Sequence, residues 1–69
     1  MTATEFNVER QREIMRLGNI LAELDTAHDL AEEYAQDGDG PLMNFYIELS
    51  NIIAEIMDKV RDQISELKS

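Results

Sequence analysis

The residues of this 69-residue chain that could carry chemistry gather around one histidine and one acidic turn. His28 is the only histidine, with Asp25 three residues before it and Glu32 four residues after it. Residues at these spacings are neighbours on a helix, so both carboxylates can lie beside the imidazole. Such a group could bind a metal ion or form a pH-sensitive interface. We favour a structural role for a half-buried His28 with a carboxylate neighbour, and we predict no metal site.

The acidic turn has the sequence Asp37-Gly38-Asp39-Gly40-Pro41. Asp37, Asp39 and Glu48 stand at positions 1, 3 and 12 of a calcium-binding loop. Position 6 of such a loop needs a glycine for its sharp turn, and this chain has Leu42 there. We therefore interpret the stretch as an ordinary acidic turn and not as a calcium site.

No other group of residues typical of an enzyme is present in the sequence. It contains no glycine-rich phosphate loop and no paired Glu-x-x-His sequence of the kind that holds two irons in a helical bundle. Ser50, Ser65 and Tyr46 have no adjacent base, and the lack of cysteine excludes disulfides and thiolate metal sites. We predict that the protein is not an enzyme and carries no cofactor.

Two helices must position these residues, because the turn is the only cluster of helix-breaking residues in the chain. We predict an all-α helical hairpin in a single domain over 1–69. The first helix is expected over about 4–36, the turn over 37–41 and the second helix over about 42–68. Gly18 could break the first helix, but the apolar spacing keeps its phase across this residue, so a straight helix is favoured.

The turn residues also predict how the two helices end and begin. Gly38 is expected just past the first helix in a left-handed conformation. Asp39 or Gly40 is expected to cap the second helix, with Pro41 in its first turn.

Apolar residues recur in steps of three and four in both helices, over arcs wider than one partner helix can cover. In the first helix a heptad row runs from Ile14 to Ala35, and a second row contains Ile20, Ala27 and Tyr34. We therefore predict that two hairpins pack as an antiparallel homodimeric four-helix bundle. The apolar residues assigned to the oligomer or partner interface are Leu17, Ile20, Leu21, Leu24, Tyr34, Phe45, Tyr46, Leu49, Ile53, Ile56, Met57, Val60 and Ile64.

Charge is unevenly distributed along this acidic chain, whose formal net charge is −9. Residues 17–58 include ten acidic residues and no Lys or Arg, and all six basic residues lie outside this range. Direct binding to nucleic acid or to anionic membranes is therefore not expected, because both need clustered basic side chains. The second helix carries an acidic row that is either a solvated face or a docking surface for a basic partner: Glu48, Glu55, Asp58, Asp62 and Glu66.

These features favour a small non-enzymatic protein–protein interaction module: a regulator, adaptor or assembly chaperone. Two alternatives are an acidic inhibitor that mimics nucleic acid on a DNA- or RNA-handling protein, and a bundle that holds a small ligand. In length and layout the chain resembles small hairpin regulators, such as the plasmid RNA-binding dimer, and the hairpin co-chaperones of secretion systems. The first of these uses a basic face, which residues 17–58 lack. A cytoplasmic location is expected, with leaderless secretion as the alternative.

Overall fold

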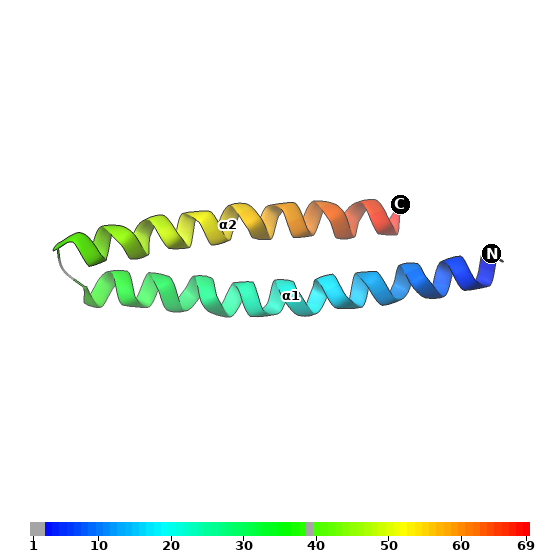
Figure 1. The fold of residues 1–69 in the computed structure, drawn as a ribbon, viewed down its shortest axis with the longest axis horizontal. Coiled ribbons are helices and arrows are strands. Elements are labelled where there is room, and N and C mark those ends of the chain that lie inside the picture. The colour runs from blue at the N-terminus through cyan, green and yellow to red at the C-terminus, as the bar shows by residue number, and fades with distance from the viewer. Residues whose placement is uncertain (1–2, 39) are drawn as a thin grey trace.

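The computed structural model describes residues 3–38 and 40–69, with side chains from Glu5 onward, and the fold within these ranges is a helical hairpin (Figure 1). Helix α1 spans Ala3–Asp37 and helix α2 spans Gly40–Lys68. The helices lie side by side and antiparallel, so the start of α1 and the end of α2 lie at the same end of the molecule, which we call the open end (Figure 1). The predicted all-α hairpin is confirmed.

Helix α1 passes through Gly18 without interruption. A methyl group added at Gly18 would have no packed neighbour within 4 Å, so the missing side chain makes no room for the other helix of the hairpin. The straight helix follows from the apolar residues on both sides of Gly18, which keep one phase and pack against the same partner helix.

The reversal between the helices is tighter than the predicted turn, because α2 begins at Gly40. The N–H of Gly38 donates a hydrogen bond to the carbonyl of Tyr34 at 2.9 Å, which continues the helical pattern past the last residue of α1. The positive φ of 65° belongs to Gly40, so the prediction of a left-handed Gly38 was wrong. The predicted alternative cap, Asp39, lies outside the described residues.

The helices contact each other along one row of residues on each, which we call the seam. The residues of both rows follow one another in steps of three and four, the heptad spacing of coiled coils. The buried and half-buried residues of the seam are Ile14, Leu17, Leu21, Leu24, His28, Ala31 and Ala35 of α1, and Met43, Tyr46, Ser50, Ile53, Met57, Val60, Ile64 and Leu67 of α2.

The core formed by this seam is small. Its most buried residues are Ala31, Ala35, Ser50, Ile53 and Met57, and among the described residues no large side chain is completely enclosed. The hydroxyl of Ser50 donates to the carbonyl of Ile47 at 2.8 Å, so this buried polar group is satisfied within its own helix. The hairpin is long and thin, with extents of 57 × 14 × 13 Å. Most residues of both helices are exposed to solvent. A hairpin of this size alone is therefore marginally stable.

Two basic residues near the open end form ion pairs within their own helices. Arg16 pairs with Glu13 at 2.8 Å and Arg61 pairs with Asp58 at 3.2 Å. Both pairs join residues three positions apart on one helix and are exposed, so each contributes about 0–1 kcal/mol to stability. Contact between α1 and α2 therefore depends mainly on the seam.

Candidate protein-interaction surface

One side of the hairpin carries a row of exposed apolar residues on each helix. We call this surface the apolar face; it consists of Ile20, Ala27, Leu30 and Tyr34 of α1 and of Leu42, Phe45, Leu49, Ile52 and Ile56 of α2. Within each helix these residues follow one another at steps of three, four or seven, so they lie on one side of it. Leu42 and Phe45 expose 63% and 55% of their surface, whereas Leu49 is half-buried at the inner edge of the face.

A shallow groove of about 230 Å³ joins the two exposed rows across the seam. Its lining consists of Ala27, Leu30, Ala31 and Tyr34 of α1 and of Tyr46, Leu49 and Ile53 of α2. Because both helices line this groove, their exposed rows face the same side of the hairpin. Pockets for small molecules usually enclose about 300–1,000 Å³. An open apolar groove between two helices is better suited to a third helix.

Three aromatic residues give the loop end of the apolar face a defined shape. The rings of Tyr34 and Tyr46 lie edge to face with 5.5 Å between their centroids, and those of Phe45 and Tyr46 do so at 5.8 Å. Tyr46 is half-buried in the seam, so it holds both exposed rings against the hairpin. Edge-to-face pairs of this kind contribute about 0.5–1.5 kcal/mol beyond the area they bury.

The structure divides the apolar residues predicted for an interface between two places. Ile20, Tyr34, Phe45 and Ile56 lie exposed on the apolar face, with Leu49 at its inner edge. The others lie in the seam, where they face the other helix of the same chain: Leu17, Leu21, Leu24, Tyr46, Ile53, Met57, Val60 and Ile64. The seam residues therefore already pack within one chain, and a second chain would contact mainly the exposed residues of the apolar face.

The prediction omitted Ala27 and three large residues of the apolar face, namely Leu30, Leu42 and Ile52. The exposure of the three large residues ranges from 42% to 63%. A sequence signal was present for these three, because each lies three or four residues before a predicted interface residue on the same helix. These rows could not be assigned to the exposed side until the position of the seam was known.

The acidic row of α2 is exposed along its whole length. We call it the acidic ridge: Glu48, Glu55, Asp58, Asp62 and Glu66. The Nη1 of Arg61 donates to Oδ1 of Asp58 at 3.2 Å. Within the part of the chain that the structure describes, no other ion pair involves the ridge. Its remaining carboxylates thus face solvent.

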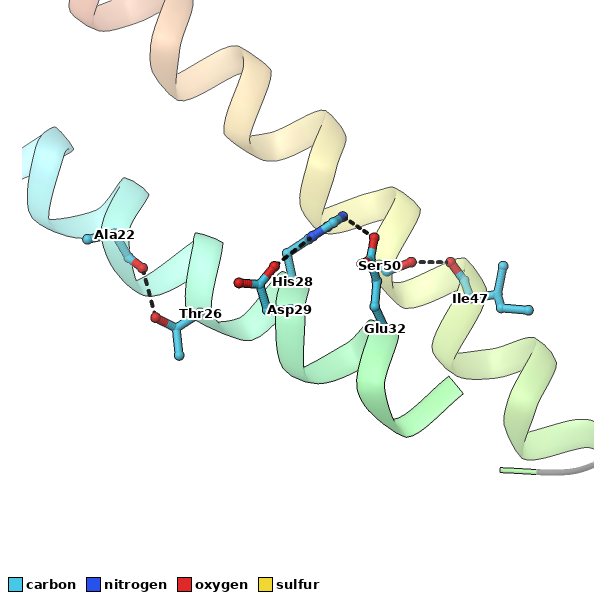
Figure 2. A network of polar contacts seen from close by, with 7 residues as sticks. All are labelled: Ala22, Thr26, His28, Asp29, Glu32, Ile47 and Ser50. Atoms are coloured by element: carbon cyan, nitrogen blue, oxygen red, sulfur yellow. Dashed lines mark hydrogen bonds and ion pairs between the residues drawn. The ribbon is translucent and has the colours of Figure 1, made fainter. Parts of the chain in front are cut away.

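His28 lies half-buried in the seam with a carboxylate near each ring nitrogen (Figure 2). Its Nε2 is 3.4 Å from Oε1 of Glu32, and its Nδ1 is 3.8 Å from Oδ1 of Asp29. Glu32 is therefore a neighbour, as predicted. Asp25 forms no ion pair with His28 among the described residues; Asp29 lies nearest the second nitrogen instead.

The ligand atoms of His28, Asp29 and Glu32 lie within 4.8 Å of one another. In these pairs the two carboxylates are exposed and lie beside different nitrogens of the ring, Glu32 beside Nε2 and Asp29 beside Nδ1. The arrangement is that of a half-buried histidine held by exposed acidic neighbours.

The calcium-loop spacing of the turn does not correspond to a loop in the structure. Asp37 is the last residue of α1, and Glu48 lies well inside α2. The third member of the pattern, Asp39, lies outside the described residues. A calcium-binding loop draws its ligands from a continuous 12-residue loop, which α2 interrupts here.

A hollow of about 540 Å³ lies near the start of α1. Its lining residues come from α1 alone: Asn7, Val8, Gln11, Arg12 and Met15. A single helix cannot surround a ligand, so this hollow is open surface and not a binding cavity.

Neither the family models nor the curated proteins nor the solved structures compared with this chain include one that matches it. Over the described residues, neither helix has an apolar stretch long enough to cross a lipid bilayer. The function is therefore inferred from the surface itself.

Proposed function

We propose that this hairpin is a non-enzymatic protein–protein interaction module that binds helices of a second chain through its apolar face. The observation that carries the proposal is the row of large exposed apolar side chains on the same side of both helices. Apolar patches rimmed by polar residues are typical of protein interaction sites. A helix laid along the groove would cover residues of α1 and α2 at the same time.

The small core of the hairpin supports this proposal. Residues such as Leu42 and Phe45 are more than half exposed, and covering them removes apolar surface from water at about 25 cal/mol per Å². Helices from a second chain would complete a three- or four-helix bundle with a larger core. The antiparallel homodimer predicted from the sequence is one way to form such a bundle.

Site-specific photo-crosslinking in the host cell tests the proposal. A benzophenone amino acid at Ile52 lies on the apolar face, whereas the same group at Asn44 is exposed on another side of α2. We expect a crosslink to a second chain from position 52 and none from position 44, and Phe45→Asp should suppress it. Equal crosslinking from both positions, or none from either, would contradict the proposal.

The acidic ridge supports a second candidate function, which is inhibition of a DNA- or RNA-handling protein by mimicry of a phosphate backbone. The specific observation is a row of exposed carboxylates with one ion pair among the described residues, between Asp58 and Arg61. Such a row can attract a basic surface that normally binds nucleic acid.

Charge reversal separates this second candidate from the first. Reversal of Glu48, Glu55 and Asp62 to Lys should abolish a crosslink formed from position 58, and added duplex DNA should compete with that crosslink. Binding that survives both the reversal and the competitor eliminates mimicry.

A further inference from the structure

We propose that the occupant of the apolar face is a single basic amphipathic helix of another protein, with Lys and Arg on both sides of an apolar stripe. This inference rests on the proposed function and specifies the chemistry of the partner. It comes from the carboxylates that border the apolar face along both of its long edges.

Each edge is defined by residues that lie three or four positions from a residue of the apolar face, which makes them neighbours on the helix surface. The edge on α1 contains Glu23, Glu33 and Asp37, and all three are exposed. The edge on α2 contains Glu48 and Glu55, the first two residues of the acidic ridge. The apolar face and the acidic ridge are thus adjoining parts of one surface. We call these five residues the edge carboxylates.

The edge carboxylates have no cationic partner within the described structure. None of them forms an ion pair with another described residue. Only Glu55 has a basic residue within one helical turn, because Lys59 lies four residues after it; the other four edge carboxylates have none. Most of the cations that complement this surface must therefore come from the molecule that binds it.

A second copy of this chain complements the surface less well. Two apolar faces packed together would bring five edge carboxylates from each copy to a shared rim, where each copy supplies two bordering basic residues, Arg16 and Lys59, both at the end of the face away from the loop. Like charges at the rim of an interface oppose association. This repulsion is strongest at low salt, because charges then interact over a longer distance, with a Debye length of about 30 Å at 0.01 M. A basic helix replaces this repulsion with attraction while it covers the same apolar residues.

The dimensions of the apolar face set the length of the partner helix. Leu42 and Ile56 are fourteen residues apart on α2, a distance of about 21 Å at about 1.5 Å per residue. Ile20 and Tyr34 are also fourteen residues apart on α1. A helix of about 15 residues therefore spans the face, with apolar residues at steps of three and four in the groove. Lys and Arg on its two flanks would reach the edges on α1 and α2 together.

Designed peptides provide the first test, with the full chain as the receptor. Three fluorescent peptides of about 18 residues are titrated with the protein while anisotropy is measured. The first has a Leu/Ile stripe flanked by Lys, the second has the same stripe flanked by Glu, and the third has the residues of the first in an order without a stripe. We expect the Lys-flanked peptide to bind at least about tenfold more tightly than the Glu-flanked one, and the shuffled peptide not to bind. Affinity for the Lys-flanked peptide should fall as NaCl rises from about 50 to about 500 mM.

Charge-reversed variants locate the contact. Glu48→Lys with Glu55→Lys should weaken binding of the Lys-flanked peptide about tenfold and improve binding of the Glu-flanked one. The matched control, Glu9→Lys with Asp25→Lys, changes the net charge equally at exposed positions outside the apolar face and the acidic ridge and should leave the ratio of the two affinities unchanged. Ile52→Asp should weaken both stripe peptides.

The outcomes separate this inference from the proposed function. Equal binding of the two stripe peptides, or equal effects of the two charge-reversed pairs, overturns the basic partner and leaves the interaction module standing. A homodimer in light scattering that is lost in Ile52→Asp, together with no peptide binding, also overturns the basic partner and supports the module. A monomer that binds no peptide and gives no crosslink from position 52 overturns both.

Discussion

Gly18 shows how a single residue can report whether another chain lies against α1. It lies inside the helix, and a methyl group added there would meet open space. We expect Gly18→Ala to stabilise the isolated hairpin by about 0.5–1 kcal/mol, because alanine loses less backbone entropy in a helix. Urea unfolding followed by circular dichroism measures this change. A loss of stability, or a change of mass in solution, would mean that a second helix packs against Gly18.

Gly40 is the residue whose backbone conformation permits the reversal. Its φ of 65° is in the left-handed region, which side chains with a Cβ adopt at a cost of about 1–2 kcal/mol. We expect Gly40→Ala to lower the free energy of unfolding by about 1 kcal/mol and Gly40→Asn to lower it less, since asparagine tolerates this region. Thermal unfolding of the two variants compares them. An equal loss of stability in the two variants would show that the effect does not come from the φ angle of residue 40.

The contrast between Ile52 and Ile53 shows how α2 divides its apolar residues at the scale of the element. The two are adjacent and chemically identical, yet Ile53 is buried against α1 while Ile52 is exposed on the apolar face. Consecutive residues on a helix point about 100° apart, so the seam takes one and leaves the other. One helix therefore has two apolar surfaces, one buried against α1 and one exposed.

Alanine substitutions at these two positions should separate folding from binding. We expect Ile53→Ala to lower the free energy of unfolding by about 2 kcal/mol or more, because it leaves a cavity in the small core. Ile52→Ala should change it by less than about 0.5 kcal/mol but weaken binding of the Lys-flanked peptide. Urea unfolding and peptide anisotropy on both variants provide the comparison. A larger loss of stability from Ile52→Ala than from Ile53→Ala would contradict the assignment of the seam.

The whole molecule has two ends of different charge. The loop end, within residues 17–58, has acidic residues and no Lys or Arg, whereas all six basic residues lie toward the open end. Antiparallel helices produce this division, because they place the two chain ends together (Figure 1). Self-repulsion among the carboxylates of the loop end opposes folding of the hairpin.

Added salt should therefore stabilise the hairpin in the absence of a partner. We expect the Tm to rise by several degrees between about 20 and about 500 mM NaCl, because salt screens carboxylates that have no cation nearby. Replacing Glu33 and Glu48 with Gln should reduce this rise. Glu13→Gln, at the carboxylate that pairs with Arg16, should leave it nearly unchanged. A Tm that falls as NaCl is added would show that attraction in ion pairs outweighs the repulsion among the carboxylates.

Much of this architecture can be derived from the amino-acid sequence. Helical periodicity on both sides of one Asp-Gly turn is enough to predict two helices, their antiparallel order and a continuous α1 through Gly18. The same periodicity identifies the acidic row that begins at Glu48 and the rows that contain Ile20 and Tyr34. These properties depend on residue order within single helices, where residues three and four apart are always neighbours.

Tertiary packing decides which apolar row of each helix faces the other helix. Two neighbouring rows on each helix are apolar, so hydrophobicity alone does not choose between them. The short connection keeps α1 and α2 close together near the loop, and close approach needs small side chains. Ala31, Ala35 and Ser50 meet this requirement and are buried in the seam, so the larger Leu30 and Tyr34 of the neighbouring row remain exposed. Neither sequence segment alone specifies this contact between the two helices, which divides one broad apolar arc into a buried core and an exposed apolar face.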